Sequence, residues 1–296
     1  MNAVVLVNPA AGRGRSRKKL EQVRRLCGQA GALILVTASA EETARRAREA
    51  AEGGCGRVIA AGGDGTVHLV LNGVAGTAAV LGIIPLGSGN DVARNLGVPR
   101  DVEVATRLAL SGAPRRVDLG RIAWSDEDGR TQLRWFGGVA SFGLDSHANR
   151  IANAHQRLAG TALYVYALLR TLAEWKVPVV QIESDAGAFR GPMMLAATAN
   201  SSSYGGGMRI APHADMADGR FDLCIVRQMS RLKLLRCFPE VFLGTHLRHP
   251  EITCLQASRC RVDADRRLEV FADGEFVGYT PAEVQLFPKA LSVAAP

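Results

Sequence analysis

The sequence lacks the features that mark secreted, zinc-binding and membrane-spanning proteins. Its six cysteines are scattered, with no CxxC pair and no His–Cys cluster at zinc spacing, and no signal peptide precedes the first apolar segment. The most apolar helical stretch, residues 158–175, is interrupted by Arg170 and Glu174. These absences predict reduced thiols and a cytoplasmic chain, with residues 158–175 as a core or membrane-facing helix rather than a membrane span.

Two common phosphate-binding signatures are also absent. The chain has no GxxxxGK[ST], and its GRGRSR segment lacks the third glycine of GxGxxG, which excludes the Walker and Rossmann types. The formal net charge of +8 favours an anionic partner. However, the only dense basic run, residues 13–19, has no interleaved aromatics and fits a solvated helix start. We therefore expect no nucleic-acid partner.

The residue pattern changes near the middle of the chain. Over the first ~115 residues, short apolar strands alternate with helical patterns, which predicts a βαβ layout with a parallel sheet. Later segments alternate with a two-residue period and contain Asp-Gly pairs, which predicts mainly antiparallel strands, with helices near 149–175 and 231–243. We predict an α/β domain over 1–117 and a β-rich domain over 118–287. Segment 288–296 is a candidate to return to the first domain.

Two strand–glycine turn–helix units stand close together in the first domain. They are AAGGDGTVHLVLNGV, residues 60–74, and LGIIPLGSGNDVARNLGVP, residues 81–99. A glycine turn before a helix N-terminus suits a phosphate, since backbone N–H groups and the helix dipole both face the anion. Turns after adjacent parallel strands share the sheet edge where ligands bind. The alternative is two turns that serve only the fold. Asn90 or Asp91 is expected to cap the second helix.

Asp64 stands between two glycines of the first turn, where a carboxylate would repel a phosphate. Mg²⁺ favours one or two carboxylates together with phosphate oxygens. Asp64 is therefore expected to hold a Mg²⁺ that bridges the phosphates, directly or through water. The alternative is that Asp64 only caps a helix starting at Thr66, although Thr66 could provide that cap itself.

Four motifs, in this order, resemble the diacylglycerol kinase catalytic-domain family: NPAAG (8–12), GGDGT (62–66), PLGSGND (85–91) and DGE (273–275). That family includes soluble bacterial lipid kinases and sphingosine kinases, and the resemblance covers essentially the whole chain. It implies an N-terminal α/β nucleotide-binding domain with a parallel sheet like that of NAD kinase and phosphofructokinase, plus a C-terminal β-sandwich-like domain. Ser88 departs mildly from the family's usual Thr but keeps the hydroxyl.

The resemblance also implies roles for individual residues. It implies that Glu275 accepts the proton. The local sequence alone favours a solvated strand residue that follows a turn. Asp145 aligns with an acidic position that contacts the lipid head group in sphingosine-type members; the alternative is a helix N-cap. The implied ATP-binding set is Asn8, Pro9, Ala10, Ala11, Gly12, Thr37, Gly62, Gly63, Asp64, Gly65, Thr66, Val67, His68 and Ser88.

A metal loop is implied by the segment PHADMADGRFD, which matches the family's P-x-A-x-x-x-D-G pattern. In the family, this loop holds a structural Mg²⁺. The corresponding groups here are the side chain of Asp218 and backbone groups at Asp215 and Arg220. The alternative is a simple turn before a strand.

Together, these motifs predict a lipid kinase that uses ATP and Mg²⁺. The expected acceptor is a lipid hydroxyl at a membrane surface, first of all that of diacylglycerol, which would give phosphatidic acid. Peripheral binding to the inner face of the membrane, favoured by anionic lipid, is expected from the positive charge, and a homodimer is a candidate assembly. The alternatives are an enzyme like NAD kinase and a non-catalytic nucleotide-binding regulator. PLGSGND and DGE favour the lipid family over the first, while Asp64, Ser88 and Glu275 together speak against the second.

Overall fold

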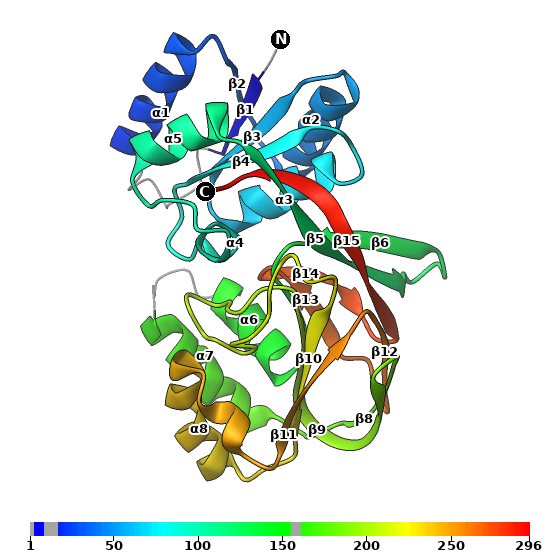
Figure 1. The fold of residues 1–296 in the computed structure, drawn as a ribbon. Helices are drawn as coiled ribbons and strands as arrows, with labels where there is room; N and C mark the ends of the chain where they lie inside the picture. Colours follow the sequence, from blue (N-terminus) through cyan, green and yellow to red (C-terminus); the bar gives the residue numbers. More distant parts are fainter. Residues whose placement is uncertain (1–2, 9–16, 155–160) are drawn as a thin grey trace. The chain divides into compact units, whose positions relative to one another are not determined.

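The computed structural model describes residues 3–8, 17–154 and 161–296 (Figure 1). The chain forms two compact units. Unit 1 comprises residues 1–119 and 288–296, and unit 2 comprises residues 120–287. Two long strands, β5 (Pro114–Ser125) and β15 (Ala282–Ala294), each contribute residues to both units.

Unit 1 is built on a parallel sheet with the strand order β2-β1-β3-β4-β15. Two of its strands, β1 and β3, are buried along almost their whole length, as expected for a parallel sheet that is covered on both faces. In addition to β15, the strands of this sheet are β1 (Ala3–Val7), β2 (Leu33–Val36), β3 (Arg57–Gly62) and β4 (Val80–Pro85).

The helices of unit 1 pack in pairs, α1 with α5 and α2 with α3 (Figure 1). Val23 and Cys27 of α1 share a buried cluster with Ile59 of β3 and Ala109 of α5, so this pair covers one face of the sheet. The helices are α1 (Arg17–Gln29), α2 (Ala40–Glu52), α3 (Asp64–Val74), α4 (Asp91–Asn95) and α5 (Val102–Ser111).

Unit 2 contains two sheets that share the long strand β9. Residues 193–199 of β9 pair within the antiparallel order β14-β13-β7-β9-β10-β11, while its residues 187–192 pair with β8, which continues to β12 and β15. The remaining hairpin pairs β5 with β6. The strands are β6 (Thr131–Phe136), β7 (Val139–Gly143), β8 (Val179–Ser184), β9 (Gly187–Ala199), β10 (Phe221–Arg227), β11 (Ile252–Ala257), β12 (Arg259–Ala264), β13 (Glu269–Ala272) and β14 (Glu275–Tyr279).

The two sheets of unit 2 enclose an apolar core. Phe142 and Phe221 from one sheet share a buried cluster with Ile182, Val262 and Val284 from the other. This is the arrangement of a β-sandwich, in which inward-facing residues of both sheets interdigitate. The predicted fold class, a parallel α/β domain followed by a β-sandwich-like domain, is confirmed.

Helices cover the other face of the sheet that contains β7, β9 and β10. Leu144, Leu172 and Leu234 form a second buried cluster with Leu195 and Val226 of the strands. The helical segments are α6 (Leu144–Ala154), α7 (Thr161–Glu174), α8 (Arg231–Leu243) and the 3-10 turn η2 (His246–Arg248). The region expected to be helical over 149–175 thus contains the end of α6 and all of α7, and its residues 155–160 lie outside the described chain.

Candidate active-site elements

Two glycine loops leave the same edge of the unit 1 sheet. Gly62 at the end of β3 pairs in register with Pro85 at the end of β4, so the loops that follow begin side by side. They touch through backbone: a Cβ atom on Gly87 would lie 2.7 Å from the Cα of Gly63. Only a residue without a Cβ permits that approach at position 87. The structure therefore brings the two predicted loops together.

Asp64 ties these loops to each other. Its Oδ2 accepts the N–H of Asn90 at 2.7 Å, and its Oδ1 accepts the N–H of Asp91 at 2.6 Å. A Cβ on Gly89 would lie 2.5 Å from Oδ2, so this glycine leaves room for the carboxylate. Asp64 thus caps α4 across 26 residues of sequence. The single carboxylate fixes the position of one loop relative to the other.

The caps of these two helices agree only in part with the expectation. α3 begins at Asp64, not at Thr66, and its N-cap residue is Gly63, which has no side chain to offer. Asn90 occupies the N-cap position of α4 with a left-handed φ of 52° but makes no side-chain cap there. The carboxylate of Asp64 takes that place, because the loop contact brings it within reach of two N–H groups.

The second loop is stiffened by its own side chains. The side-chain amide of Asn90 accepts the N–H of Gly87 at 3.0 Å and donates to the carbonyl of Gly87 at 2.7 Å. Arg94 pairs with Asp91 at 2.7 Å and donates to the carbonyl of Gly89 at 2.5 Å. Ser88 remains exposed at the tip. Asn90 and Arg94 are positioning residues; the sequence suggested Asn90 only as a helix cap and did not single out Arg94.

The other residues of the predicted ATP-binding set lie around this edge. Asn8 follows β1 directly, and Thr37 follows β2, where its buried hydroxyl bonds the hydroxyl of Thr43 at 2.7 Å. Gly62 is a close-contact position, since a Cβ there would lie 2.3 Å from the Oγ1 of Thr66. Gly63, Asp64 and Gly65 are partly exposed, whereas Thr66, Val67 and His68 are buried in the first turns of α3. Pro9, Ala10, Ala11 and Gly12 lie outside the described residues.

Glu275 lies on a two-residue hairpin turn in unit 2. Asp273 and Gly274 both have positive φ angles, 52° and 84°, which is the geometry of a type I′ turn between β13 and β14. The carboxylate of Asp273 accepts the N–H groups of Gly137 and Gly138 at 2.9 and 2.7 Å. Glu275 itself is exposed. The turn therefore presents this carboxylate to solvent on an anchored hairpin.

Asp145 lies in the first turn of α6, at the wall of a cavity inside unit 2. Its Oδ2 accepts the hydroxyl of Tyr204 at 3.0 Å, and its Oδ1 accepts the N–H of Ser146 at 2.9 Å. Burial raises the pKa of Asp145 from 3.8 to about 6, although the bond from Tyr204 and other bonds to the carboxylate oppose this rise. The carboxylate is therefore held in a setting that disfavours its charge.

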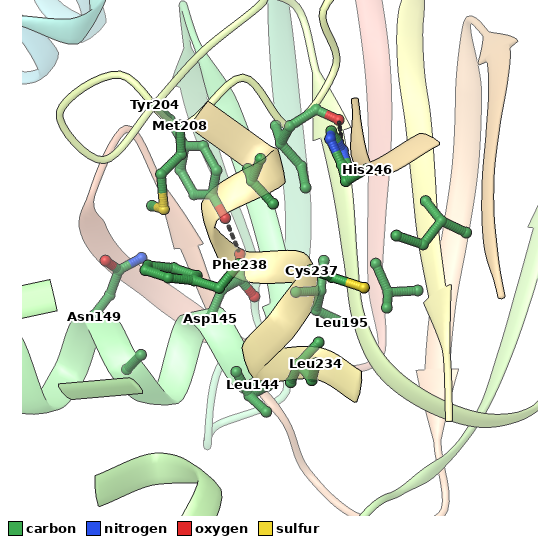
Figure 2. Close-up of a pocket in the computed structure, with 15 residues that line it drawn as sticks. Leu144, Asp145, Asn149, Leu195, Tyr204, Met208, Leu234, Cys237, Phe238 and His246 are labelled. Atoms are coloured by element: carbon green, nitrogen blue, oxygen red, sulfur yellow. Dashed lines mark hydrogen bonds between the residues drawn. The ribbon is translucent and has the colours of Figure 1, made fainter. Parts of the chain in front are cut away.

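The cavity around Asp145 is otherwise almost entirely apolar. Figure 2 shows Leu144, Leu195, Leu234 and Phe238 around it, and its polar side chains are the Asp145–Tyr204 pair, Asn149 and His246. We call it the Asp145 cavity. An apolar cavity with a few converging polar groups is the usual form of a small-molecule site.

The predicted metal loop forms an exposed turn in unit 2. The carboxylate of Asp218 accepts the N–H of Arg220 at 2.9 Å and the side-chain amide of Gln256 at 3.3 Å. Asp215 accepts the N–H of Ala217 at 3.0 Å. Burial and then the charge of Asp218 raise the pKa of the neighbouring Asp222. The loop thus gathers negative charge, and Asp218 lies close enough to Asp222 to affect its pKa.

None of the described helices is long and apolar enough to cross a membrane.

A parallel sheet with paired glycine loops, joined to a β-sandwich domain, is a two-domain architecture that nucleotide-using kinases adopt. The comparisons with known proteins agree. Residues 2–122 match the diacylglycerol kinase catalytic domain, and residues 138–295 match the YegS C-terminal domain, described as NAD kinase beta sandwich-like. A diacylglycerol kinase of Mycobacterium tuberculosis is 35% identical over 98% of this chain and 94% of its own length. The chain belongs to the diacylglycerol kinase family and is a lipid kinase.

Solved structures show the same fold. A diacylglycerol kinase from Bacillus anthracis superposes with a TM-score of 0.74 at 22% identity, covering all of this chain and 97% of that one. Yeast NADH kinase superposes with a TM-score of 0.52 at 9% identity, covering 99% and 82% of the two chains. The likeness to NADH kinase is one of fold alone. The family matches separate this chain from that alternative, and its kinase relatives exclude a non-catalytic regulator.

Proposed function

We propose that this enzyme transfers the γ-phosphate of ATP to a primary hydroxyl of diacylglycerol, giving phosphatidic acid, and that it requires Mg²⁺. The observation that carries the proposal is the Asp145 cavity. Its apolar wall suits an acyl chain, and the Asp145–Tyr204 pair provides polar contacts for a lipid head group. The named diacylglycerol kinases among the relatives support this acceptor.

The glycine loops are the proposed phosphate site. The N-terminus of α3 points its first N–H groups out of the turn at Gly63, and no N-cap side chain covers them. Backbone N–H groups and the helix dipole suit the phosphates of ATP. Asn8, Thr37 and Ser88 lie in or after the connections that leave this sheet edge, and we assign them and residues 62–68 to the nucleotide.

The carboxylates beside the loops fit Mg²⁺ chemically. A Cβ on Gly89 would lie 2.5 Å from an oxygen of Asp64 and 3.7 Å from an oxygen of Asp91, so both carboxylates face the same point. Mg²⁺ favours one or two carboxylates together with phosphate oxygens. We propose that Asp64 holds the ion, directly or through water, with Asp91 as its nearest second carboxylate. The ion would neutralise charge on the phosphates. Asp218, with backbone groups at Asp215 and Arg220, is the proposed structural Mg²⁺ site.

Glu275 is proposed to accept the proton of the attacking hydroxyl. Phosphoryl transfer needs little covalent help beyond positioning, charge neutralisation and a carboxylate that takes this proton. The anchoring of Asp273 to Gly137 and Gly138 fixes the hairpin that carries Glu275. An exposed carboxylate on a fixed turn can serve this role without losing a partner elsewhere.

The first experiment measures transfer of radiolabelled phosphate from ATP to a panel of lipids. We expect diacylglycerol to be the best acceptor, with sphingosine as the competing class. Asp145→Asn separates the two, because loss of the carboxylate removes a salt bridge to a cationic amine but only a polar contact to a neutral glycerol. Asp126→Asn, on the surface of the same unit, is the control. If the enzyme prefers sphingosine and this preference is lost in Asp145→Asn, the substrate is sphingosine and not diacylglycerol.

A second variant tests the cavity itself. Ala148 lines the Asp145 cavity from α6. Ala148→Phe should fill part of the space that an acyl chain would take, so the KM for lipid should rise while the KM for ATP stays the same. An unchanged KM for lipid in a folded variant would show that the acyl chain binds elsewhere.

Peripheral binding to anionic membranes is the proposed route to the substrate. The net charge of +8 favours such surfaces, and each well-placed Lys or Arg contributes about 1 kcal/mol. Binding to vesicles should therefore require anionic lipid and weaken with added salt. Equal binding to neutral and anionic vesicles at low and high salt would remove charge as the cause.

A further inference from the structure

Three side chains with metal-binding chemistry lie together outside the site described above. Cys237 and Glu240 are three residues apart on α8, a spacing that places both on one face of the helix. His249 follows the 3-10 turn η2. One ligand atom from each of the three lies within 4.8 Å of the others. The Nε2 of His249 is 2.7 Å from the Oε2 of Glu240.

The turn after α8 brings the histidine back to the helix. Gly244 ends α8 in a left-handed conformation with φ of 73°, and the N–H of Thr245 bonds the carbonyl of Glu240 at 3.1 Å. Arg248 binds the other carboxylate oxygen, Oε1 of Glu240, at 2.7 Å. That pairing turns Oε2 towards His249, as outer partners orient metal-ligating side chains.

We propose that Cys237, Glu240 and His249 bind Zn²⁺, with water as a fourth ligand. Thiolate, imidazole and carboxylate are the donors that Zn²⁺ takes in proteins, whereas Mg²⁺ takes oxygen donors. The side chains of Glu240 and His249 are 20% and 21% exposed, so an ion and a water molecule reach the site from solvent, while the thiol of Cys237 is buried. This site is separate from both proposed Mg²⁺ sites.

Binding at this site releases a proton. A free cysteine thiol is mainly protonated at neutral pH. A thiolate is the ligating form. The thiol S–H bond therefore breaks as the Zn–S bond forms, the sulfur keeps the electron pair, and one proton passes to the buffer for each ion bound.

The ion would also fix one wall of the Asp145 cavity. Cys237 and His246 both line that cavity, the first from α8 and the second from η2 (Figure 2). Bonds from one ion to α8 and to His249 would join the helix to the segment that leads into β11. Because an unfolded chain lacks the preformed site, the bound ion should stabilise the folded protein.

Co²⁺ is the probe for this site, because its bond to a thiolate gives a sulfur-to-metal charge-transfer absorption. The chelator-treated full-length protein should show this band, and Zn²⁺ should abolish it by displacement. Cys237→Ser should lose the band. His249→Gln should keep the fold. Its affinity for Zn²⁺ should fall by more than the roughly 10- to 100-fold that is typical when an outer-shell partner is lost. Cys254→Ser, which removes a thiol from the same unit, should behave like the unaltered protein.

Thermal unfolding and proton release provide readouts that do not depend on cobalt. Zn²⁺ should raise the Tm of the unaltered protein and of Cys254→Ser and release about one proton per ion; His249→Gln should need a higher Zn²⁺ concentration for the same rise. The proposal is overturned if the unaltered protein shows no band and no Zn²⁺-dependent rise in Tm. It is also overturned if the band survives Cys237→Ser or disappears in Cys254→Ser.

Discussion

Two aspartates lie in the first turns of two different helices of this molecule. Asp64 lies in the first turn of α3 in unit 1, and Asp145 lies in the first turn of α6 in unit 2. Asp64 is partly exposed, and each of its oxygens accepts a backbone N–H from the neighbouring loop. Asp145 is buried at the wall of a mainly apolar cavity, where its partners include the phenol of Tyr204 and the N–H of Ser146.

The difference shows that surroundings, rather than residue type or helix position, set what a carboxylate does. Two N–H bonds make Asp64 a fixed connection between the two glycine loops, the proposed phosphate site. Burial makes Asp145 a group whose pKa of about 6 lies close to neutral pH. Unit 1 thus uses its aspartate to connect two loops, whereas unit 2 places its aspartate at the wall of a mainly apolar cavity.

The largest expected effect comes from Asp64→Asn. An amide has one oxygen for two N–H groups, and its NH₂ would face an N–H, so the tie between the loops should break. The lost charge also removes a ligand that Mg²⁺ favours. We expect no detectable phosphate transfer at saturating Mg²⁺, with the circular dichroism spectrum unchanged.

Asp101→Asn is the matched control for that variant. Asp101 also accepts two backbone N–H groups, those of Glu103 and Val104, but at the N-terminus of α5. Because asparagine caps a helix nearly as well as aspartate, this variant should keep its activity. Near-normal transfer by Asp64→Asn would show that Asp64 is only a cap and that Mg²⁺ is held elsewhere.

Glu275→Gln gives the next largest effect. A group that accepts a proton only in the transition state should lower kcat by about 10²–10⁴-fold and leave the KM for ATP nearly unchanged. Stability should not change, because Glu275 is exposed. Steady-state kinetics with varied ATP will measure both constants.

The surface strand residue Glu283 provides the comparison for Glu275. It is paired with Arg261 at 3.0 Å, and Glu283→Gln should leave kcat unchanged. If Glu275→Gln changes kcat less than threefold while chemistry limits the rate, Glu275 is a turn-flanking residue. The proton acceptor would then have to be sought at Asp64 or Asp145.

Asp145→Asn should make the protein more stable at neutral pH while impairing its proposed role. A carboxylate whose folded pKa is raised adds stability below its unfolded pKa and loses it as pH rises through the folded value. The difference between 3.8 and about 6 corresponds to roughly 3 kcal/mol in the free energy of unfolding. Denaturant unfolding should be measured for both proteins at pH 4 and at pH 8. Between these pH values, the free energy of unfolding of the variant should rise relative to that of the unaltered protein by up to this amount.

Asp126→Asn should show the opposite pH dependence. A backbone N–H from Arg130 and then Gln132 lower the pKa of Asp126, so its stabilising effect is present above its unfolded pKa and is lost as pH falls. The asparagine variant should therefore lose stability at neutral pH. If Asp145→Asn behaved in the same direction, the carboxylate of Asp145 would not be penalised by burial.

Local patterns predicted the fold class and the turns. The alternation of strands and helices indicated the parallel sheet, and the Asp273–Gly274 pair indicated a tight hairpin, because such signals depend on residues close in sequence. The connection from Asp64 to Asn90 was not predicted. It depends on how closely two glycine loops approach, which spacing along the chain does not encode.

The surroundings of the other side chains were also beyond the sequence. Tyr204 lies 59 residues from Asp145, so neither the hydrogen bond nor the raised pKa leaves a local pattern. The same holds for Cys237 and His249. A search for His–Cys spacing does not find them, because the third residue of the cluster is Glu240. In addition, it is the turn at Gly244 that brings His249 near α8.

Tyr204→Phe carries the smallest expected effect and tests the cavity most finely. The phenol donates to Asp145 at 3.0 Å and thereby lowers its pKa against the larger effect of burial. A bond of this kind contributes about 0.5–1.5 kcal/mol, so its loss should raise the pKa of Asp145 by up to roughly one unit. The free energy of unfolding, measured relative to that of Asp145→Asn, falls as pH rises through the pKa of Asp145. In Tyr204→Phe, this fall should occur at a pH that is higher by that amount. In the double variant Tyr204→Phe/Asp145→Asn the shift should vanish, because no titrating carboxylate remains. A downward shift in Tyr204→Phe would mean that water entering the cavity solvates Asp145 better than the phenol does, and the cavity would then be wetter than its apolar wall indicates.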